Sequence, residues 1–369
     1  MFFTILLSVW TGLHLYVFWR VASVPFVKGH LPLKILIAFA VVLYSSFMVP
    51  WFFDRAGTHA ITRALELIGV HWLGILFLLF TCLLVVDIVT GFGFLFRSHA
   101  PELRGLALAA GVALSLIAFV QGMRAPVVND YDVHIRNLPP EADGLVIIGI
   151  SDLHLGTILG ERWLRARVDQ VNALGPDMIV LLGDIVEGHG PAELDAGVQS
   201  TMRDFHAPHG VWGVTGNHDR HGSDGAVDRF FADAGVRMLR NESVEVLPGF
   251  VVAGVDDRGY TRETGDRAKR ITQALADRPT DAATVFLSHR AEDVEQAAAS
   301  GVGLMLSAHT HNGQIWPFNY IVGRTYRFMA GRYDIDGMPI IVCRGTGTWG
   351  PRMRLWAPGE ILRVTLRAR

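Results

Sequence analysis

Seven side chains between residues 152 and 311 offer the atom types that bind divalent metal ions. They lie in short motifs that follow apolar runs, and they comprise two carboxylates, one amide and four imidazoles. Oxygen and imidazole ligands in this mixture suit borderline divalent metals. Two such ions close together can activate water and clamp a phosphoryl group, so the motifs predict two-metal hydrolytic chemistry. The seven residues are Asp152, His154, Asp184, Asn217, His289, His309 and His311.

The spacing within the motifs favours one shared site. Asp152 and His154 stand two residues apart just past a strand-like run, and His309 and His311 repeat that arrangement. Residues two apart in extended chain point the same way, so the two side chains of each pair can face one site. Asp184 follows the next strand-like run and can bridge two metals, while Gly183 before it allows a tight turn.

Strand-like and helix-like segments alternate from residue 145 onward. Helical spacing covers residues 161–174, and Gly175-Pro176 ends that helix. The alternation predicts buried parallel strands, whose binding sites form beyond their carboxyl ends. Three later apolar runs, at 250–255, 339–343 and 361–366, suggest a second sheet. The runs that precede the ligand motifs are 145–150, 178–182, 211–214, 284–287 and 302–306.

The first third of the chain has a different composition. Half of all residues are hydrophobic, and the excess is concentrated before residue 124. Four apolar stretches approach or exceed the ~20 residues that cross a bilayer core. We therefore predict a transmembrane region over residues 1–124, a linker with a first edge strand over 125–144, and a catalytic domain over 145–369. The predicted spans are residues 2–19, 33–53, 67–96 and 106–122.

Two other interpretations of the apolar stretches are less favoured. Buried core helices would leave more polar faces, and a cleavable signal peptide would carry a basic segment that Met1 and its neighbours lack. His14 and Asp87 fall within or near the spans, where ionisable groups are functional candidates. We favour the simpler interpretation that Asp87 lies near an interface or pairs within the helix bundle.

The basic residues of the loops indicate an orientation. Four spans place the amino terminus and the catalytic domain on the same side of the membrane. The loops of the opposite side carry about one more basic residue, which favours a catalytic domain outside the cytoplasm. We expect a multi-pass protein of a bacterial inner membrane. The basic residues compared are Arg20, Lys28, Lys34, Arg97 and Arg104 against Arg55, Arg63, Arg124 and Arg136.

The ordered motifs resemble those of the calcineurin-like metallophosphoesterases, and the likeness covers residues 145–369. It is greatest to the membrane-associated or exported bacterial branch, whose typical ending is similar to His311-Asn-Gly-Gln314, residues 344–351 and residues 358–362. The resemblance implies an α/β fold with a four-layer α/β/β/α sandwich. It also implies in-line attack on phosphorus, with His218 stabilising or protonating the leaving oxygen. The implied ligand sets are Asp152, His154, Asp184 and His311 for one metal, and Asp184, Asn217, His289 and His309 for the other.

This chain departs from the family pattern at three positions. Glu187 stands where an aspartate is common, and this longer acid, like Asp219, is a candidate to support the site from behind the ligands. Ala308 replaces a usual glycine before His309. Trp349 stands where a small residue is common, so the pocket formed by that loop is expected to differ.

Together these observations predict a membrane-anchored phosphoesterase with two divalent ions, Mn by resemblance, with Fe and Zn open. The bond cleaved is a phosphomonoester, phosphodiester or pyrophosphate bond, and the tether favours a lipid-linked or cell-envelope substrate. The alternatives are a non-catalytic metal-binding receptor or scaffold, and a UDP-diacylglucosamine-type pyrophosphatase if the domain is cytosolic. A net charge of −2 argues against a nucleic-acid partner, and two cysteines form no disulfide framework.

Overall fold

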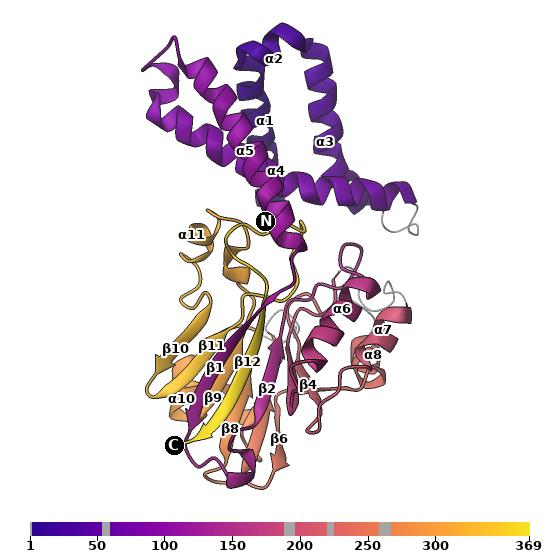
Figure 1. Ribbon diagram of the computed structural model, residues 1–369, viewed down its shortest axis with the longest axis vertical. Helices are drawn as coiled ribbons and strands as arrows, with labels where there is room; N and C mark the ends of the chain where they lie inside the picture. Colours follow the sequence, from indigo (N-terminus) through magenta and orange to yellow (C-terminus); the bar gives the residue numbers. More distant parts are fainter. Residues whose placement is uncertain (1, 54–59, 188–195, 220–224, 258–266) are drawn as a thin grey trace. The chain divides into compact units, whose positions relative to one another are not determined.

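The chain folds into two compact units (Figure 1). The helical unit comprises Met1–Met123 together with Gly350–Trp356, and the α/β unit comprises Arg124–Trp349 and Ala357–Arg369. The computed structural model describes residues 2–53, 60–187, 196–219, 225–257 and 267–369.

The helical unit is organised around its longest helix, α4. This helix packs against α1, α3 and α5, and its Leu76 and Leu83 are fully buried with Trp10 of α1. Gly69 lets α3 approach, because a Cβ there would lie 2.6 Å from the Phe47 Cα. The helices are α1 (Phe2–Ser23), α2 (Pro25–His30), α3 (Leu33–Phe53), α4 (Ala60–Val89), the 3₁₀ turn η2 (Gly91–Gly93) and α5 (Ala100–Met123).

Three helices of the described residues are long and apolar enough to cross a membrane. Judged by length and composition, these are Thr4–Ser23, Ile61–Val89 and Ala100–Met123. The apolar part of α3, Leu33–Val49, is shorter. The prediction of four spans therefore stays a prediction, while apolar helices able to span a membrane are present.

The third predicted span corresponds to α4, and this helix begins and ends earlier than hydropathy indicated. It covers Ala60–Val89 rather than residues 67–96. Apolar residues continue beyond Val89, but Gly91, Phe92 and Gly93 all have positive φ, at 54°, 57° and 91°, which ends an α-helix. Hydropathy alone does not register this turn. Two other ends also differ, because α1 ends at Ser23 rather than residue 19 and α5 begins at Ala100 rather than residue 106.

Asp87 forms a buried charged cluster within the helical unit. Its carboxylate is fully buried and lies 2.5 Å from Arg20 Nε and 2.9 Å from Arg104 Nη2. Arg104 Nε and the Tyr16 hydroxyl also donate to it, at 3.0 and 2.6 Å. The cluster joins α1, α4 and α5, so Asp87 pairs within the bundle, as the simpler interpretation predicted.

Replacing Asp87 with Asn should destabilise the helical unit by about 3 kcal/mol or more, because two buried guanidinium groups would lose their counter-charge. Thermal unfolding of the full chain in detergent would measure this loss. Glu102→Gln, on an exposed residue of α5, is the control and should unfold like the wild type. An Asp87→Asn protein that unfolds at the wild-type temperature would contradict a structural role for the cluster.

The α/β unit contains two six-stranded sheets, of which the first has the order β1-β12-β2-β3-β4-β5. β2 to β5 run parallel, whereas β12 is antiparallel to β2 and parallel to the edge strand β1. Figure 1 shows β1 and β12 side by side, although the whole domain separates them in sequence. The bounds are β1 Val127–Ile135, β2 Val146–Ile150, β3 Met178–Leu182, β4 Val211–Val214, β5 Val236–Met238 and β12 Glu360–Ala368.

The second sheet has the order β10-β11-β9-β8-β7-β6. Its four central strands are parallel, and the edge strands β6 and β10 are antiparallel to their neighbours. The apolar runs at 250–255 and 339–343 thus belong to this second sheet, whereas the run at 361–366 belongs to the first. The bounds are β6 Glu242–Leu247, β7 Phe250–Gly254, β8 Ala283–Leu287, β9 Leu304–Ser307, β10 Gly331–Ile335 and β11 Met338–Val342.

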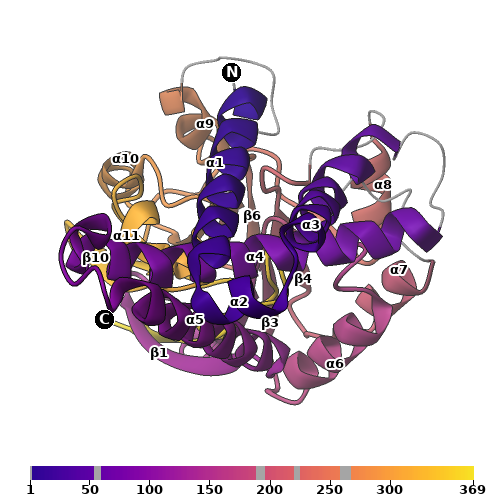
Figure 2. The same ribbon diagram turned by 90° about the horizontal axis from the view of Figure 1, so that it is seen from above.

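The two sheets pack face to face, and helices cover their outer faces. Alternate residues of β2 show why: Ile147 belongs to the core between the sheets, whereas Ile148 and Ile150 pack under the helices. In Figure 2, α6, α7 and α8 lie along one flank, and α9 and α10 lie on the other. This arrangement is the predicted four-layer α/β/β/α sandwich. The helices and short turns are η3 Pro140–Ala142, α6 Glu161–Asn172, α7 Ala196–Met202, α8 Ala226–Asp233, α9 Arg267–Ala274, α10 Val294–Ala299, η5 His311–Gly313 and α11 Asn319–Val322.

Candidate metal centre

The predicted ligands lie in loops at the carboxyl ends of five strands. β2, β3 and β4 of the first sheet lead into Asp152, Asp184 and Asn217, and β8 and β9 of the second lead into His289 and His309. Because the sheets pack face to face, both sets of loops meet at one edge. The site is therefore shared between the sheets.

The backbone at these loops adopts a conformation that side chains rarely accept. Five of the seven predicted ligands have positive φ, between 44° and 79°. Non-glycine residues in this region are uncommon and cost free energy, and they concentrate at functional sites. The surrounding fold must therefore hold these loops in place. The five residues are Asp152, His154, Asp184, His309 and His311.

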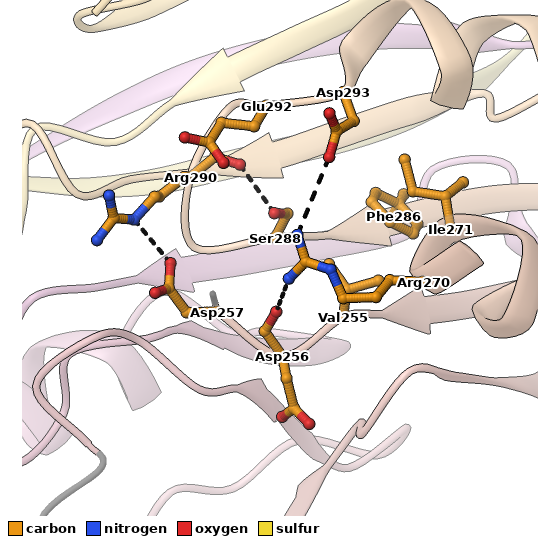
Figure 3. Close-up of a pocket in the computed structure, with 10 residues that line it drawn as sticks. All are labelled: Val255, Asp256, Asp257, Arg270, Ile271, Phe286, Ser288, Arg290, Glu292 and Asp293. Carbon is orange, nitrogen blue, oxygen red and sulfur yellow. Dashed lines mark hydrogen bonds and ion pairs between the residues drawn. The ribbon is translucent and has the colours of Figure 1, made fainter. Parts of the chain in front are cut away.

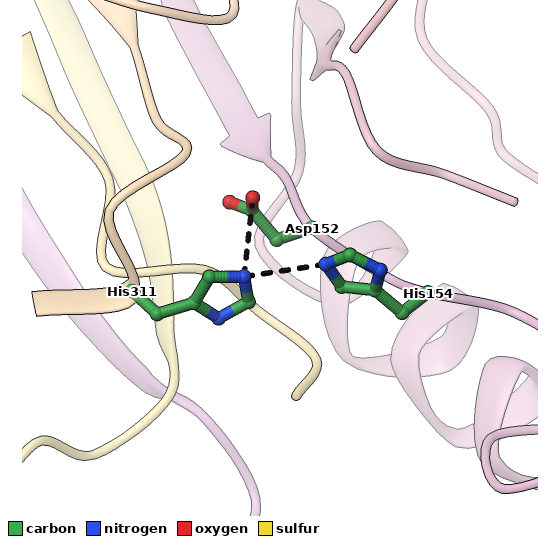
Figure 4. A group of neighbouring side chains, drawn as sticks. All are labelled: Asp152, His154 and His311. Atoms are coloured by element: carbon green, nitrogen blue, oxygen red, sulfur yellow. Dashed lines mark hydrogen bonds and ion pairs between the residues drawn. The ribbon is translucent and has the colours of Figure 1, made fainter. Parts of the chain in front are cut away.

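The first ligand group contains Asp152, His154 and His311 (Figure 4). His311 Nε2 lies 3.2 Å from His154 Nε2 and 3.4 Å from Asp152 Oδ1. Both carboxylate oxygens of Asp152 are buried without a hydrogen-bond partner among the described residues. A buried, unsatisfied carboxylate facing two imidazoles is the arrangement that a divalent cation stabilises.

The second group contains Asp184, His289 and His309. His289 Nε2 lies 3.1 Å from both Asp184 Oδ2 and His309 Nδ1. Asp184 also lies between the groups, because the same oxygen is 3.9 Å from His154 Nε2. The structure thus gathers six of the seven predicted ligands, with Asp184 of the second group 3.9 Å from a histidine of the first.

Asn217, the seventh predicted ligand, has a different partner. Its Oδ1 accepts a hydrogen bond from Arg290 Nη2 at 2.9 Å. Arg290 directly follows His289 in the chain, so this bond keeps the amide oxygen beside the second group. Arg290 was not among the residues that the motifs singled out, although its position next to a predicted ligand is a usable signal.

Glu187 holds two histidines of the site at once. Its carboxylate accepts hydrogen bonds from Nδ1 of His154 and from Nδ1 of His218, the latter at 3.0 Å. Burial favours a higher pKa for Glu187, but the charges and hydrogen bonds of the two histidines lower its pKa to about 2. The longer acid therefore reaches His218 and orients a predicted metal ligand as well.

Asp219 stabilises the loops rather than facing the ligand groups. Its fully buried carboxylate accepts backbone hydrogen bonds of 2.7–2.9 Å from Gly216, Asp184, Ile185 and Val186. These bonds join the loop after β4 to the loop after β3. Burial and the nearby Asp184 raise the pKa of Asp219 to about 6.

Gly216 is required by this close approach of the two loops. A Cβ there would lie 2.3 Å from the Asp184 backbone nitrogen. Gly183 has φ 85° and equally little room, since a Cβ would lie 2.7 Å from His289 Nδ1. The Gly-Asp and Gly-Asn-His-Asp motifs therefore owe their glycines to packing between the ligand loops.

Two aromatic residues complete the surroundings of the site. The Tyr326 hydroxyl lies 2.8 Å from His309 Nε2. Trp349 lies with its ring centroid 6.2 Å from that of His218, and its backbone exchanges two hydrogen bonds with the Gln314 side chain. Trp349 thus borders the site, in the loop whose pocket was expected to differ, whereas no sequence motif indicated Tyr326.

The charges of the site suit cations. Burial lowers the pKa of His154, but Glu187, Asp184 and Asp152 outweigh burial and raise it to about 9. Burial is likewise outweighed at His289, where Asp184 raises the pKa to about 10. Two protonated imidazoles therefore neutralise the buried carboxylates, and a metal ion can take over that role by displacing their protons.

Metal binding at pH 7 should therefore release about two protons per chain, from His154 and His289, because metal ligation requires neutral imidazole. Calorimetric titration of Mn²⁺ into the full chain, in buffers with different ionisation enthalpies, would count them. Release should fall as the pH rises through the two pKa values. His206→Gln, on an exposed histidine, should behave like the wild type, and metal binding without proton release would contradict the assignment.

Comparison with known proteins agrees with the fold and the ligand pattern. Residues 145–313 match the family model described as calcineurin-like phosphoesterase. An uncharacterized metallophosphoesterase of Campylobacter jejuni is 31% identical over 266 residues, which are 71% of this chain and 69% of that protein. A transmembrane protein with metallophosphoesterase domain from Bos taurus is 30% identical over 71% of this chain and 62% of its own length.

Among solved structures, a dimetal phosphatase from Danio rerio overlaps with 55% of this chain and 88% of its own, at 15% identity and a TM-score of 0.35. The identity and the TM-score are low, so the family assignment rests on the sequence matches. The sandwich with its shared histidine and carboxylate edge defines a metallophosphoesterase. This chain belongs to the calcineurin-like phosphoesterase family. Its apolar helices and its likeness to transmembrane relatives indicate a membrane association.

Proposed function

We propose that this chain is a membrane-anchored hydrolase that cleaves phosphoric ester or pyrophosphate bonds with two divalent metal ions. The observation that carries the proposal is the pair of ligand groups, with Asp184 of the second lying 3.9 Å from His154 of the first. Mn²⁺ is the ion we propose, with Fe and Zn as alternatives for the same ligands. When bound, the ions would supply a nucleophile from water and neutralise charge on the phosphoryl oxygens.

The chain's own residues would perform three tasks in this reaction. Asp152 and Asp184 provide the buried negative charge that holds the cations. His218, whose side chain is 24% exposed, borders the ligand groups and can donate a proton to the leaving oxygen. Glu187 fixes the His218 ring through Nδ1, so Nε2 is the nitrogen that would face the leaving group.

Asp184→Asn should abolish nearly all metal-dependent activity, because the carboxylate of the second ligand group, which also lies 3.9 Å from His154 of the first, would be lost. Hydrolysis of bis-p-nitrophenyl phosphate and p-nitrophenyl phosphate by the full chain in detergent, with Mn²⁺ or EDTA, would test this. His206→Gln is the control and should retain activity. Substantial turnover by Asp184→Asn would contradict the proposed site.

The ratio of the two activities would separate a diesterase from a monoesterase. Failure of the wild type to cleave either compound would favour a narrow lipid substrate or the non-catalytic receptor. A UDP-linked acylated substrate would require a cytosolic domain, whereas the basic residues of the loops favour the outer side of the membrane.

The segment after η5 supports a lipid-linked substrate. Phe318, Tyr320 and Ile321 on and before α11 are 39%, 65% and 57% exposed. The neighbouring Arg324 is exposed as well, and aromatic and aliphatic side chains beside arginine suit a membrane interface. α11 packs against the ligand loop, because a Cβ on Gly313 would lie 2.3 Å from the Asn319 Cα. An acyl chain on this surface would therefore lie close to the site.

Replacing Tyr320 and Ile321 together with Ser should lower kcat/KM for dioleoyl phosphatidic acid in mixed micelles by about tenfold, from lost apolar contact. Activity on p-nitrophenyl phosphate should be unchanged, since neither residue reaches the ligand groups. Val127→Ser, on a similarly exposed residue of the edge strand β1, is the matched control. An equal loss on both substrates, or no loss on either, would contradict a lipid-binding role.

A further inference from the structure

Arg290 and Asp257 form a charge pair at the border of the metal centre (Figure 3). Arg290 Nε donates to Asp257 Oδ2 at 2.8 Å, and Nη2 donates to Asn217 Oδ1 at 2.9 Å. The Asp257 side chain is 2% exposed and that of Arg290 is 21% exposed. One edge of the guanidinium is thus anchored on a buried carboxylate, and the group reaches the oxygen of a predicted ligand.

The backbone of Asp257, whose carboxylate anchors Arg290, is itself held near the ends of two strands. Asp257 follows β7, and its backbone N–H donates to Thr215 Oγ1 at 3.2 Å, just past β4. Thr215 in turn donates to Asp256 Oδ1 at 3.0 Å. The pair therefore spans both sheets on the same edge as the ligands. Such a supported arrangement fixes the direction of the guanidinium before any substrate binds.

The positive charge of Arg290 favours an anion rather than a cation beside Asn217. A guanidinium 2.9 Å from the oxygen of Asn217 would be repelled by a cation bound to that oxygen, and Asp257 lies on its other edge. A phosphoryl group held by the metals would place negative oxygens beside Arg290. Arginine matches such oxygens because its planar fork has five donors, and the bonds to Asp257 and Asn217 involve Nε and Nη2.

Arg270 is a second arginine in the pocket of Figure 3, and its bonds do not lead to the metal centre. Arg270 Nη1 donates to the Asp256 carbonyl, and its Nη2 lies 4.0 Å from Asp293. These bonds connect α9 to its surroundings and involve none of the predicted metal ligands. Of the two arginines that line the pocket, Arg290 is the one directed at the site.

We propose that Arg290 binds a phosphoryl oxygen of the substrate on the Asn217 side of the metal centre, and that Asp257 is its positioning residue. This inference rests on the proposed function for its substrate class. It adds a contact from the protein itself to the charge that the metals supply. Neither Arg290 nor Asp257 belongs to the seven predicted ligands.

The test is calorimetric binding of inorganic phosphate to the Mn²⁺-loaded full chain in detergent, with Mn²⁺ content and affinity measured in parallel. Arg290→Gln should weaken phosphate binding by about ten- to a hundredfold, as expected for a lost charge-assisted hydrogen bond, and should not lower Mn²⁺ affinity, because a positive charge beside Asn217 is removed. Arg278→Gln is the charge-matched control. Its guanidinium bonds to Thr284 and Ser300, away from the carboxyl end of β8, and it should bind phosphate like the wild type.

Two further variants separate binding from support. Arg290→Lys keeps the positive charge but loses the planar guanidinium, so it should bind phosphate with intermediate affinity. If Arg290→Gln does not fold, the phosphate affinity of Arg290→Lys tests the proposal instead. Asp257→Asn should weaken phosphate binding in the wild type and have little further effect in Arg290→Gln, because a positioning residue acts only through its partner.

The outcomes are distinct. Phosphate affinity at the wild-type level in both Arg290→Gln and Arg290→Lys would overturn the proposal. A loss of phosphate affinity that accompanies an equal loss of Mn²⁺ affinity would also overturn it, because Arg290 would then act by positioning Asn217. A wild-type chain that binds phosphate through Arg290 but cleaves neither nitrophenyl compound would favour a narrow lipid substrate or a non-catalytic receptor, and this inference would still stand.

Discussion

The arrangement of the catalytic unit depends on two carboxylates that have almost no access to water. Asp152 and Asp184 are 0% and 2% exposed, and burying such charges without compensation costs several kcal/mol each. Imidazoles on neighbouring strand ends surround them, and two of these, His154 and His289, carry protons when no cation is present, because nearby carboxylates raise their pKa values. The surrounding hydrogen bonds, including the four that Asp219 accepts, hold loops whose backbone would otherwise avoid positive φ. The fold thus supplies a concentrated negative site and the means to neutralise it.

Further acidic side chains position the residues around these two carboxylates. Glu187 reaches two histidines, and Asp257 directs Arg290 towards the oxygen of Asn217. Each supporting acid is anchored at the end of a strand or in the loop that follows one. Mutual positioning of this kind allows charged groups to face a substrate without reorganising, which is the main source of electrostatic catalysis.

The helical unit also contains a buried carboxylate, and its charge is neutralised by arginines. Asp87 is fully buried among apolar helices, and two arginines and a tyrosine compensate its charge directly. Burial of ions is favourable only when all of their bonds are satisfied, so this cluster connects three helices in one arrangement. Apolar exposure on α1, α4 and α5 remains high, which is consistent with a lipid surrounding.

The sequence by itself determined the ligand types, the strand runs 178–182 and 211–214 to the residue, and the apolar character of the first third. These are local properties, set by side-chain chemistry and by hydrophobic periodicity. Only the tertiary structure decided that loops from two sheets meet, that Glu187 holds His154 as well as His218, and that Arg290 bonds to Asn217. Such contacts join residues 31 to 73 positions apart, and no periodicity or motif specifies them. The end of α4 differed from expectation for a similar reason, because positive φ at residues 91–93 stops a helix that hydropathy would continue.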